Sequence, residues 1–240
     1  MRKLTSAIPL SFVAAAVLIA GLVRDGLAGP LEDLRAQTEA AARRGDPHAQ
    51  TLLGIMYEKG LGVRPNPVRA LEWFRAAANR GDSTGCALVG RAYADGRGVP
   101  SDDTQALAWF NRSAQNELRE FVRQPIGFAG GTEGALEFAE QGNPLAQIAV
   151  AKMYLTGYGV EQNDTEAVRW LSTGTAAGSI GAELLLALML QEGRGGLPQD
   201  TGEAMRLYRK AAEQIAQLTE SSVGMVCAAL TGRPDCTRGR

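Results

Sequence analysis

The sequence predicts an all-α fold, an α/α superhelical solenoid in which helix pairs stack one after another. One segment recurs along the chain, and glycines and capping residues stand at the same places in every copy. Within each copy the apolar residues follow the period of a helix. Recurrence of this kind is typical of solenoids, because each helix pair buries its apolar face only against its neighbours.

The first element, residues 1–28, is predicted to be an export signal. The chain starts with basic residues (MRK), and the run from Ala7 to Val23 is almost wholly apolar. Small residues then precede a cleavage point before Gly29. An uncleaved membrane anchor is the alternative, and in both cases the basic end stays inside. We therefore expect a periplasmic or secreted protein, or one anchored in the inner membrane with its repeats outside the cytoplasm.

Residues 29–44 are predicted to form an N-terminal capping helix, because Leu34 to Arg44 resemble only the second helix of a pair. The repeats follow in residues 45–116 and 142–214, two copies in each range. Every copy opens with a glycine and a residue able to cap a helix. These pairs are Gly45-Asp46, Gly81-Asp82, Gly142-Asn143 and Gly178-Ser179. Because glycine enters the left-handed conformation without steric cost, we expect one helix to end there and the next to begin.

The second helix of each copy is predicted to begin at another capping residue and to carry a large packed side chain. The caps are Asn66, Asp102, Asn163 and Asp200. The three tryptophans share one position of this helix, with a leucine in the fourth copy. These residues are Trp73, Trp109, Trp170 and Leu207. Small residues stand four positions further on, so we expect large-against-small packing where the pairs stack.

Two stretches depart from the repeat. Residues 117–141 do not match it, and the sequence leaves open whether they form an irregular insert or a degenerate repeat. The preceding helix is expected to continue until Pro125, which cannot extend it. Residues 215–240 are predicted to form a C-terminal capping helix and a tail.

The repeated strings resemble a known family. AQTLLGIMYEKGLGV and ALEWFRAAANRGD, both in the first copy, are similar to the Sel1-like repeat, a relative of the tetratricopeptide repeat. The resemblance covers residues 45–116 and 142–214. It implies an α/α superhelix with a concave inner face. It also implies an adaptor that assembles complexes or regulates signalling, often at or beyond the bacterial inner membrane.

Charge and residue type argue against several function classes. The chain has 25 basic and 26 acidic residues, so no basic excess is available to neutralise the phosphates of a nucleic acid. The only histidine, His48, stands in the first turn of a first helix, where we expect a solvated side chain rather than a general base. The string GDSTG from Gly81 imitates a nucleophile turn, but helix caps already explain it. We therefore predict no catalytic residue, no metal site, no cofactor and no enzymatic activity.

A second class of function stays open as an alternative. A cysteine-rich branch of Sel1-like proteins has been associated with β-lactam binding or hydrolysis, and a cell-wall fragment would be a related ligand. That branch carries a cysteine pair in each repeat, whereas the repeats of this chain contain Cys86 alone. Exposed aromatic residues would favour such a ligand. The aromatic residues here fall on the packed stripes, which favours a protein partner.

The two remaining cysteines, Cys227 and Cys236, flank a turn-prone stretch near the C-terminus. In an oxidising compartment they are predicted to form a disulfide, and idle thiols are the alternative. The loop would stabilise this end by about 2 to 3 kcal/mol. Cys86 is then expected to be a small core residue.

A partner is expected on the concave face, which the first helices of the pairs line. The positions that vary between copies there give apolar ends around a basic middle. The predicted binding residues are His48, Ile55, Lys59, Arg91, Lys152 and Leu188. Such a groove fits a protein or peptide segment with an acidic centre, for example from an envelope signalling or secretion complex. The membrane is a partner only through an uncleaved N-terminal segment.

Overall fold

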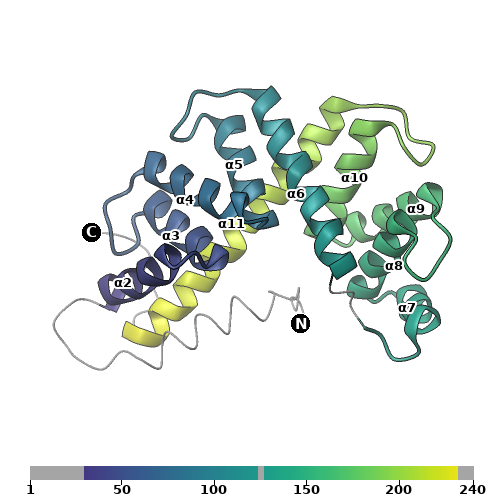
Figure 1. Cartoon of the computed structure of the whole chain (residues 1–240), viewed down its shortest axis with the longest axis horizontal. Coiled ribbons are helices and arrows are strands. Elements are labelled where there is room, and N and C mark those ends of the chain that lie inside the picture. The colour runs from purple at the N-terminus through teal and green to yellow at the C-terminus, as the bar shows by residue number, and fades with distance from the viewer. Residues whose placement is uncertain (1–29, 124–126, 232–240) are drawn as a thin grey trace. The chain divides into compact units, whose positions relative to one another are not determined.

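The computed structural model describes residues 30–123 and 127–231, and of residues 30–31, 223–224 and 226–231 it describes the backbone only. Every regular element in these ranges is a helix, which confirms the predicted all-α class (Figure 1). The helices are α2 (Pro30–Arg43), α3 (Pro47–Lys59), α4 (Pro67–Asn79), α5 (Ser83–Asp95), α6 (Asp103–Arg123), α7 (Gly131–Glu140), α8 (Pro144–Thr156), α9 (Asp164–Ala176), α10 (Ile180–Glu192) and α11 (Thr201–Thr231). Within the described ranges, no helix combines the length and the apolar character needed to cross a membrane.

The predicted caps begin these helices. The Asp46 carboxylate accepts a hydrogen bond from the Ala49 amide at 2.8 Å, and the equivalent residues Asp82, Asn143 and Ser179 accept in the same way. Before the second helices, Asn66 and Asn163 do the same. Each first helix then ends at a left-handed glycine, such as Gly60 with φ 77°. The local sequence therefore sets the length of each helix.

The chain divides into two compact units. The first contains residues up to Ala106 together with those from Gln214 onward, and the second contains Leu107–Glu213. In the first unit α3 packs against α2, α4 and α5. In the second unit α8 packs against α7 and α9, and α9 against α10. Each unit therefore has helix pairs packed in chain order around a core of its own.

Helix α7 takes the place of a second helix in the repeat. The Gln147 amide donates to the Ala139 carbonyl at the end of α7 at 3.3 Å, just as Gln50 of α3 donates to the Ala42 carbonyl of α2 at 3.0 Å. The same offset of eight residues separates both pairs. This favours the degenerate repeat over the irregular insert for the region around α7.

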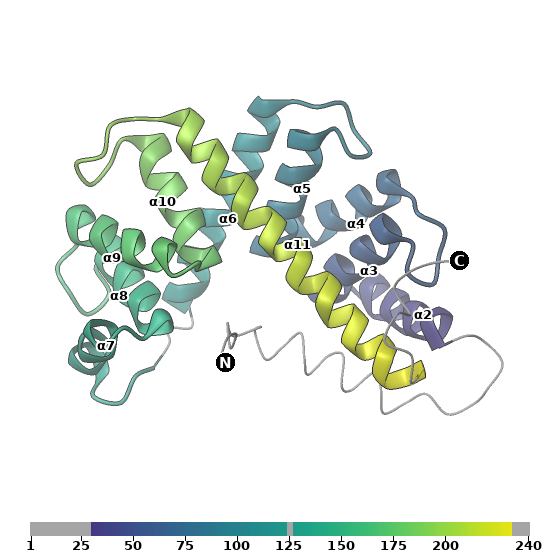
Figure 2. The same ribbon diagram turned by 180° about the vertical axis from the view of Figure 1, so that it is seen from behind.

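The C-terminal part differs from the predicted separate capping helix. α11 runs without a break from Thr201 to Thr231, as Figure 2 shows along its length. No glycine or proline interrupts residues 203–223, so nothing local ends the helix after the fourth repeat. Its residues from Gln214 onward belong to the first unit, where Glu220 pairs with Lys59 of α3 at 2.8 Å.

Of the predictions for the three cysteines, the structure bears only on that for Cys86. Cys86 is fully buried in α5, as expected for a core residue. The side chain of Cys227 and all of Cys236 lie outside the described residues, as do residues 1–28. The disulfide and the export signal therefore stay predictions.

Candidate functional site

The apolar ends of the predicted binding groove do not lie on the surface. Ile55 of α3 is 1% exposed and Leu188 of α10 is 2% exposed. The prediction that they contact a partner is therefore wrong for the folded chain. For Ile55 the reason is that α3 packs against α2, α4 and α5, which leaves little of its surface open.

The basic middle of that groove is occupied by the chain's own carboxylates. In the first unit, Arg91 is buried and its Nη2 lies 2.6 Å from Oε2 of Glu58. In the second unit, Lys152 is buried and its Nζ lies 3.0 Å from Oε2 of Glu117. Because each cation already has a buried or half-buried partner, neither presents an open charge to an acidic segment.

The two other predicted residues remain partly accessible. His48 is half-buried in the first turn of α3. Lys59, at the end of α3, is exposed and pairs with Glu220 of α11. The structure therefore does not bring the predicted residues together as one open surface, and a role for His48 and Lys59 in binding stays a prediction.

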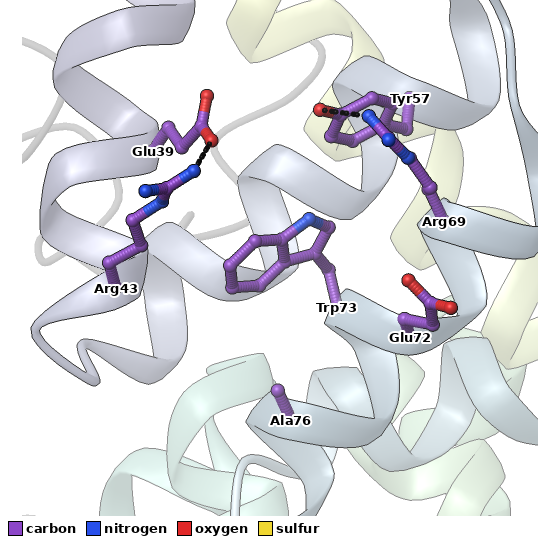
Figure 3. A pocket seen from close by; sticks show the side chains of 7 residues that line it. All are labelled: Glu39, Arg43, Tyr57, Arg69, Glu72, Trp73 and Ala76. Carbon is purple, nitrogen blue, oxygen red and sulfur yellow. Dashed lines mark hydrogen bonds and ion pairs between the residues drawn. The ribbon is translucent and has the colours of Figure 1, made fainter.

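A pocket lies elsewhere in the first unit, lined by residues of α2, α3 and α4. It has a volume of ≈ 410 Å³. Seven side chains line it, as Figure 3 shows: Glu39, Arg43, Tyr57, Arg69, Glu72, Trp73 and Ala76. The indole of Trp73 is half-buried and forms the centre of the drawn group.

The charged groups around the pocket are one ion pair, one arginine that lies on a tyrosine, and one remaining carboxylate. Arg43 donates to Glu39 at 2.6 Å along α2. Arg69 lies over the ring of Tyr57, 5.6 Å from its centre, and donates to its hydroxyl at 3.4 Å. Glu72 is exposed and makes no ion pair with any described residue. The pocket therefore offers an aromatic ring beside a carboxylate that has no cation on it.

Local sequence explains how these side chains reach one place. Asn66 caps α4 and sets its register, so Arg69, Glu72, Trp73 and Ala76 fall on adjacent turns of one face. Tyr57 comes from the last turns of α3, and Glu39 and Arg43 stand one turn apart on α2. The sequence reasoning missed this site because it assigned the whole tryptophan position to packing. Glu72 and Ala76, whose equivalents in other copies are different residue types, were the available signal.

No group of three histidine, cysteine, aspartate or glutamate side chains in the described part of the chain is placed to hold a metal ion. The lining of the pocket combines aromatic rings, carboxylates and the small side chain of Ala76, which is the kind of surface that suits a side chain of a partner.

Comparisons with known proteins agree with the repeat pattern. A sequence model of the Sel1 repeat matches residues 47–82, 83–118, 144–179 and 180–214. No curated protein matches the chain. Among solved structures, a Sel1 repeat protein from Oxalobacter formigenes is 23% identical with a TM-score of 0.37, over 85% of this chain and 84% of that one.

A second solved structure is a protective antigen present in uropathogenic Escherichia coli strains, which displays an SLR fold. It is 26% identical with a TM-score of 0.39, and the match covers 94% of this chain. The chain spans 49% of the length of that protein.

Proposed function

This chain belongs to the Sel1 repeat family, and we propose that it is an exported, non-catalytic scaffold that binds a protein partner. Proteins of this family generally mediate protein–protein interactions through their helix-pair repeats. The partner would be a protein or peptide of the cell envelope, for example a component of a signalling or secretion complex. The near-zero charge of the chain offers no attraction for a nucleic acid.

The observation that carries this proposal is the pocket around Trp73. Tryptophan, tyrosine and arginine are the residues that contribute most to binding at protein interfaces, and all three line this pocket. The side chains that the helix pairs need for packing are buried, as Phe74 next to Trp73 is at 2% exposure. A half-buried tryptophan in a pocket is thus available to a partner without any loss of the core. No comparison with a known protein, and no side-chain contact among the described residues, favours the alternative of a cell-wall or β-lactam ligand.

The test compares two tryptophans that share one repeat position. The full chain, with Trp73→Ala or Trp109→Ala or unchanged, is immobilised and exposed to envelope extract of its native host. Trp109 is the matched control, since it is also half-buried but does not line the pocket.

A specific partner should be retained by the unchanged chain and by the Trp109 variant, and lost by the Trp73 variant. Its binding is then measured by calorimetry with purified protein, and circular dichroism checks that both variants fold. Failure of the unchanged chain to retain any specific partner would contradict the scaffold. Equal retention by the Trp73 variant would move the binding surface away from the pocket.

A further inference from the structure

Two of the three equivalent tryptophans have an arginine of the same helix on their ring. Arg112 lies over Trp109, with its Cζ 5.2 Å from the ring centre, and Arg169 lies over Trp170 at 4.4 Å. The two arginines come from different positions: Arg169 directly precedes its tryptophan, and Arg112 follows three residues later. Both positions place a guanidinium over the ring, where a cation is attracted by the ring's electrons.

The first repeat has no cation at either position. Glu72 directly precedes Trp73, where the third repeat has Arg169, and Ala76 follows three residues later, where the second repeat has Arg112. Both replacements line the pocket. Among the described residues no arginine or lysine lies over the ring of Trp73. The pocket thus lies beside the one ring of the three that has no arginine of its own helix on it.

The two arginines nearest to the pocket are directed elsewhere. Figure 3 shows the guanidinium of Arg43 turned to Glu39 and that of Arg69 turned to Tyr57. Each would have to leave an existing hydrogen bond in order to reach Trp73. Glu72 meanwhile stands beside the indole as a carboxylate without a cation, which further favours a positively charged occupant.

We propose that the Trp73 pocket receives an arginine side chain of the partner polypeptide, which stacks on the indole and pairs with Glu72. This inference rests on the proposed function and names the chemistry of its partner. Arginine fits better than lysine, because a planar guanidinium stacks on an aromatic ring and bonds a carboxylate at the same time. A glutamate of the partner would meet the Glu72 carboxylate beside the ring and would have to compete with Glu39 for Arg43 and with the Tyr57 hydroxyl for Arg69.

Two variants of Glu72 test the site: one supplies a guanidinium from the chain itself, and the other only removes the charge of the carboxylate. Glu72→Arg reproduces the Arg-Trp sequence of the third repeat, so the chain's own guanidinium should cover Trp73 and close the site. Glu72→Gln keeps the size of the side chain and removes its charge, which should weaken binding about two- to fivefold. Glu72 is exposed, so both variants should fold as the unchanged chain does.

The experiment follows the indole N–H signals of the full chain by NMR during titration with short capped peptides. The probes carry arginine, its neutral isostere citrulline, lysine or glutamate at the central position, and methylguanidinium serves as a small cation. Trp73→Phe assigns the signal of Trp73. We expect saturable shifts of this signal with the arginine peptide, at least severalfold weaker binding of the citrulline peptide, and loss of the response in Glu72→Arg.

Equal binding of the arginine and citrulline peptides, or tighter binding of the glutamate peptide, would overturn the proposal. So would methylguanidinium binding as tightly as the peptide, which would make this a site for small cations. The result also separates the two proposals. A partner that is lost by Trp73→Ala but retained by Glu72→Arg would support the scaffold function and contradict the proposed arginine. If no partner is found but the arginine peptide binds at Trp73, the arginine site is supported and the scaffold function is contradicted.

Discussion

At the scale of residues, the most deeply buried large side chain of each second helix is the one directly after the tryptophan position. Phe74, Phe110, Leu171 and Tyr208 are all exposed by no more than 2%. The tryptophan position itself ranges from half-buried at Trp73 and Trp109 to 4% exposure at Trp170. The prediction that all three tryptophans are packed is therefore correct only for Trp170. The position after the tryptophan should therefore tolerate substitution less well than the tryptophan position itself.

Two neighbouring substitutions test this difference. Phe110 is fully buried and stacks on Tyr208 with ring centres 5.2 Å apart, so Phe110→Ala should lower the free energy of unfolding by about 3 to 5 kcal/mol. Trp109→Ala removes a half-buried ring and should cost about 1 to 2 kcal/mol. Urea unfolding followed by circular dichroism measures both. A larger loss for Trp109→Ala would show that the tryptophan is the anchor after all.

Arg91 is a structural residue rather than an open binding residue. Its side chain is 8% exposed and that of Glu58 is 10% exposed, so Arg91→Ala leaves a buried carboxylate with only Arg97 beside it. We expect a loss of about 2 to 4 kcal/mol in the free energy of unfolding. Arg123→Ala, in an exposed pair with Glu120, is the control and should leave stability nearly unchanged. Equal stability of the two variants would contradict the buried ion pair.

Tyr208 predicts an alkaline limit to stability. Burial raises the pKa of its hydroxyl above the ordinary value of 10.0. The folded state thus keeps the proton, and the stabilisation is present below pH 10 and lost as the pH rises and the unfolded chain ionises. The loss amounts to at most about 1.4 kcal/mol per pH unit. In urea unfolding between pH 9 and 11, Tyr208→Phe should be less sensitive to pH than the unchanged chain.

At the scale of elements, α11 joins two roles in one helix. Its first part is the second helix of the fourth repeat, and its last part packs within the first unit. Ala216 and Thr219 of this last part are buried, and Glu220 reaches Lys59 of α3. One face of the extension therefore packs against the first unit, on the side of α3 where the sequence predicted a partner.

A charge on that buried face should loosen α3. Ala216 is 3% exposed, so Ala216→Asp places an unpaired carboxylate against apolar contacts. Hydrogen exchange at the amides of α3 should become at least tenfold faster, while α8 in the second unit serves as an internal reference. Gln217→Asp, at an exposed neighbouring position, is the matched control. Unchanged exchange in α3 would mean that the extension does not support it.

At the scale of the whole molecule, the repeats form two units, and α6 and α11 each contribute residues to both. The Sel1 repeats span both units, from residue 47 to residue 214. Binding and packing surfaces are thus best described unit by unit, with the Trp73 pocket wholly inside the first.

Export is a property of the whole chain and is tested on protein from its native host. N-terminal sequencing should give a start at Gly29, because the preceding small residues fit a cleavage site. Recovery of Met1 in the membrane fraction would support the uncleaved anchor instead. Recovery of Met1 in the cytosolic fraction would contradict export.

The sequence by itself determined the class of fold, the repeat boundaries and the caps. Asp46 and Gly60, for example, act through backbone groups within four residues of themselves, so their roles can be read locally. Only the tertiary structure decided which side chains are open. Ile55 is buried and Trp73 is half-buried because of how the other helices pack around them, which the periodicity of a single helix does not specify. The pocket likewise needs α2, α3 and α4 together, since no single helix contains its aromatic ring, its carboxylates and its walls.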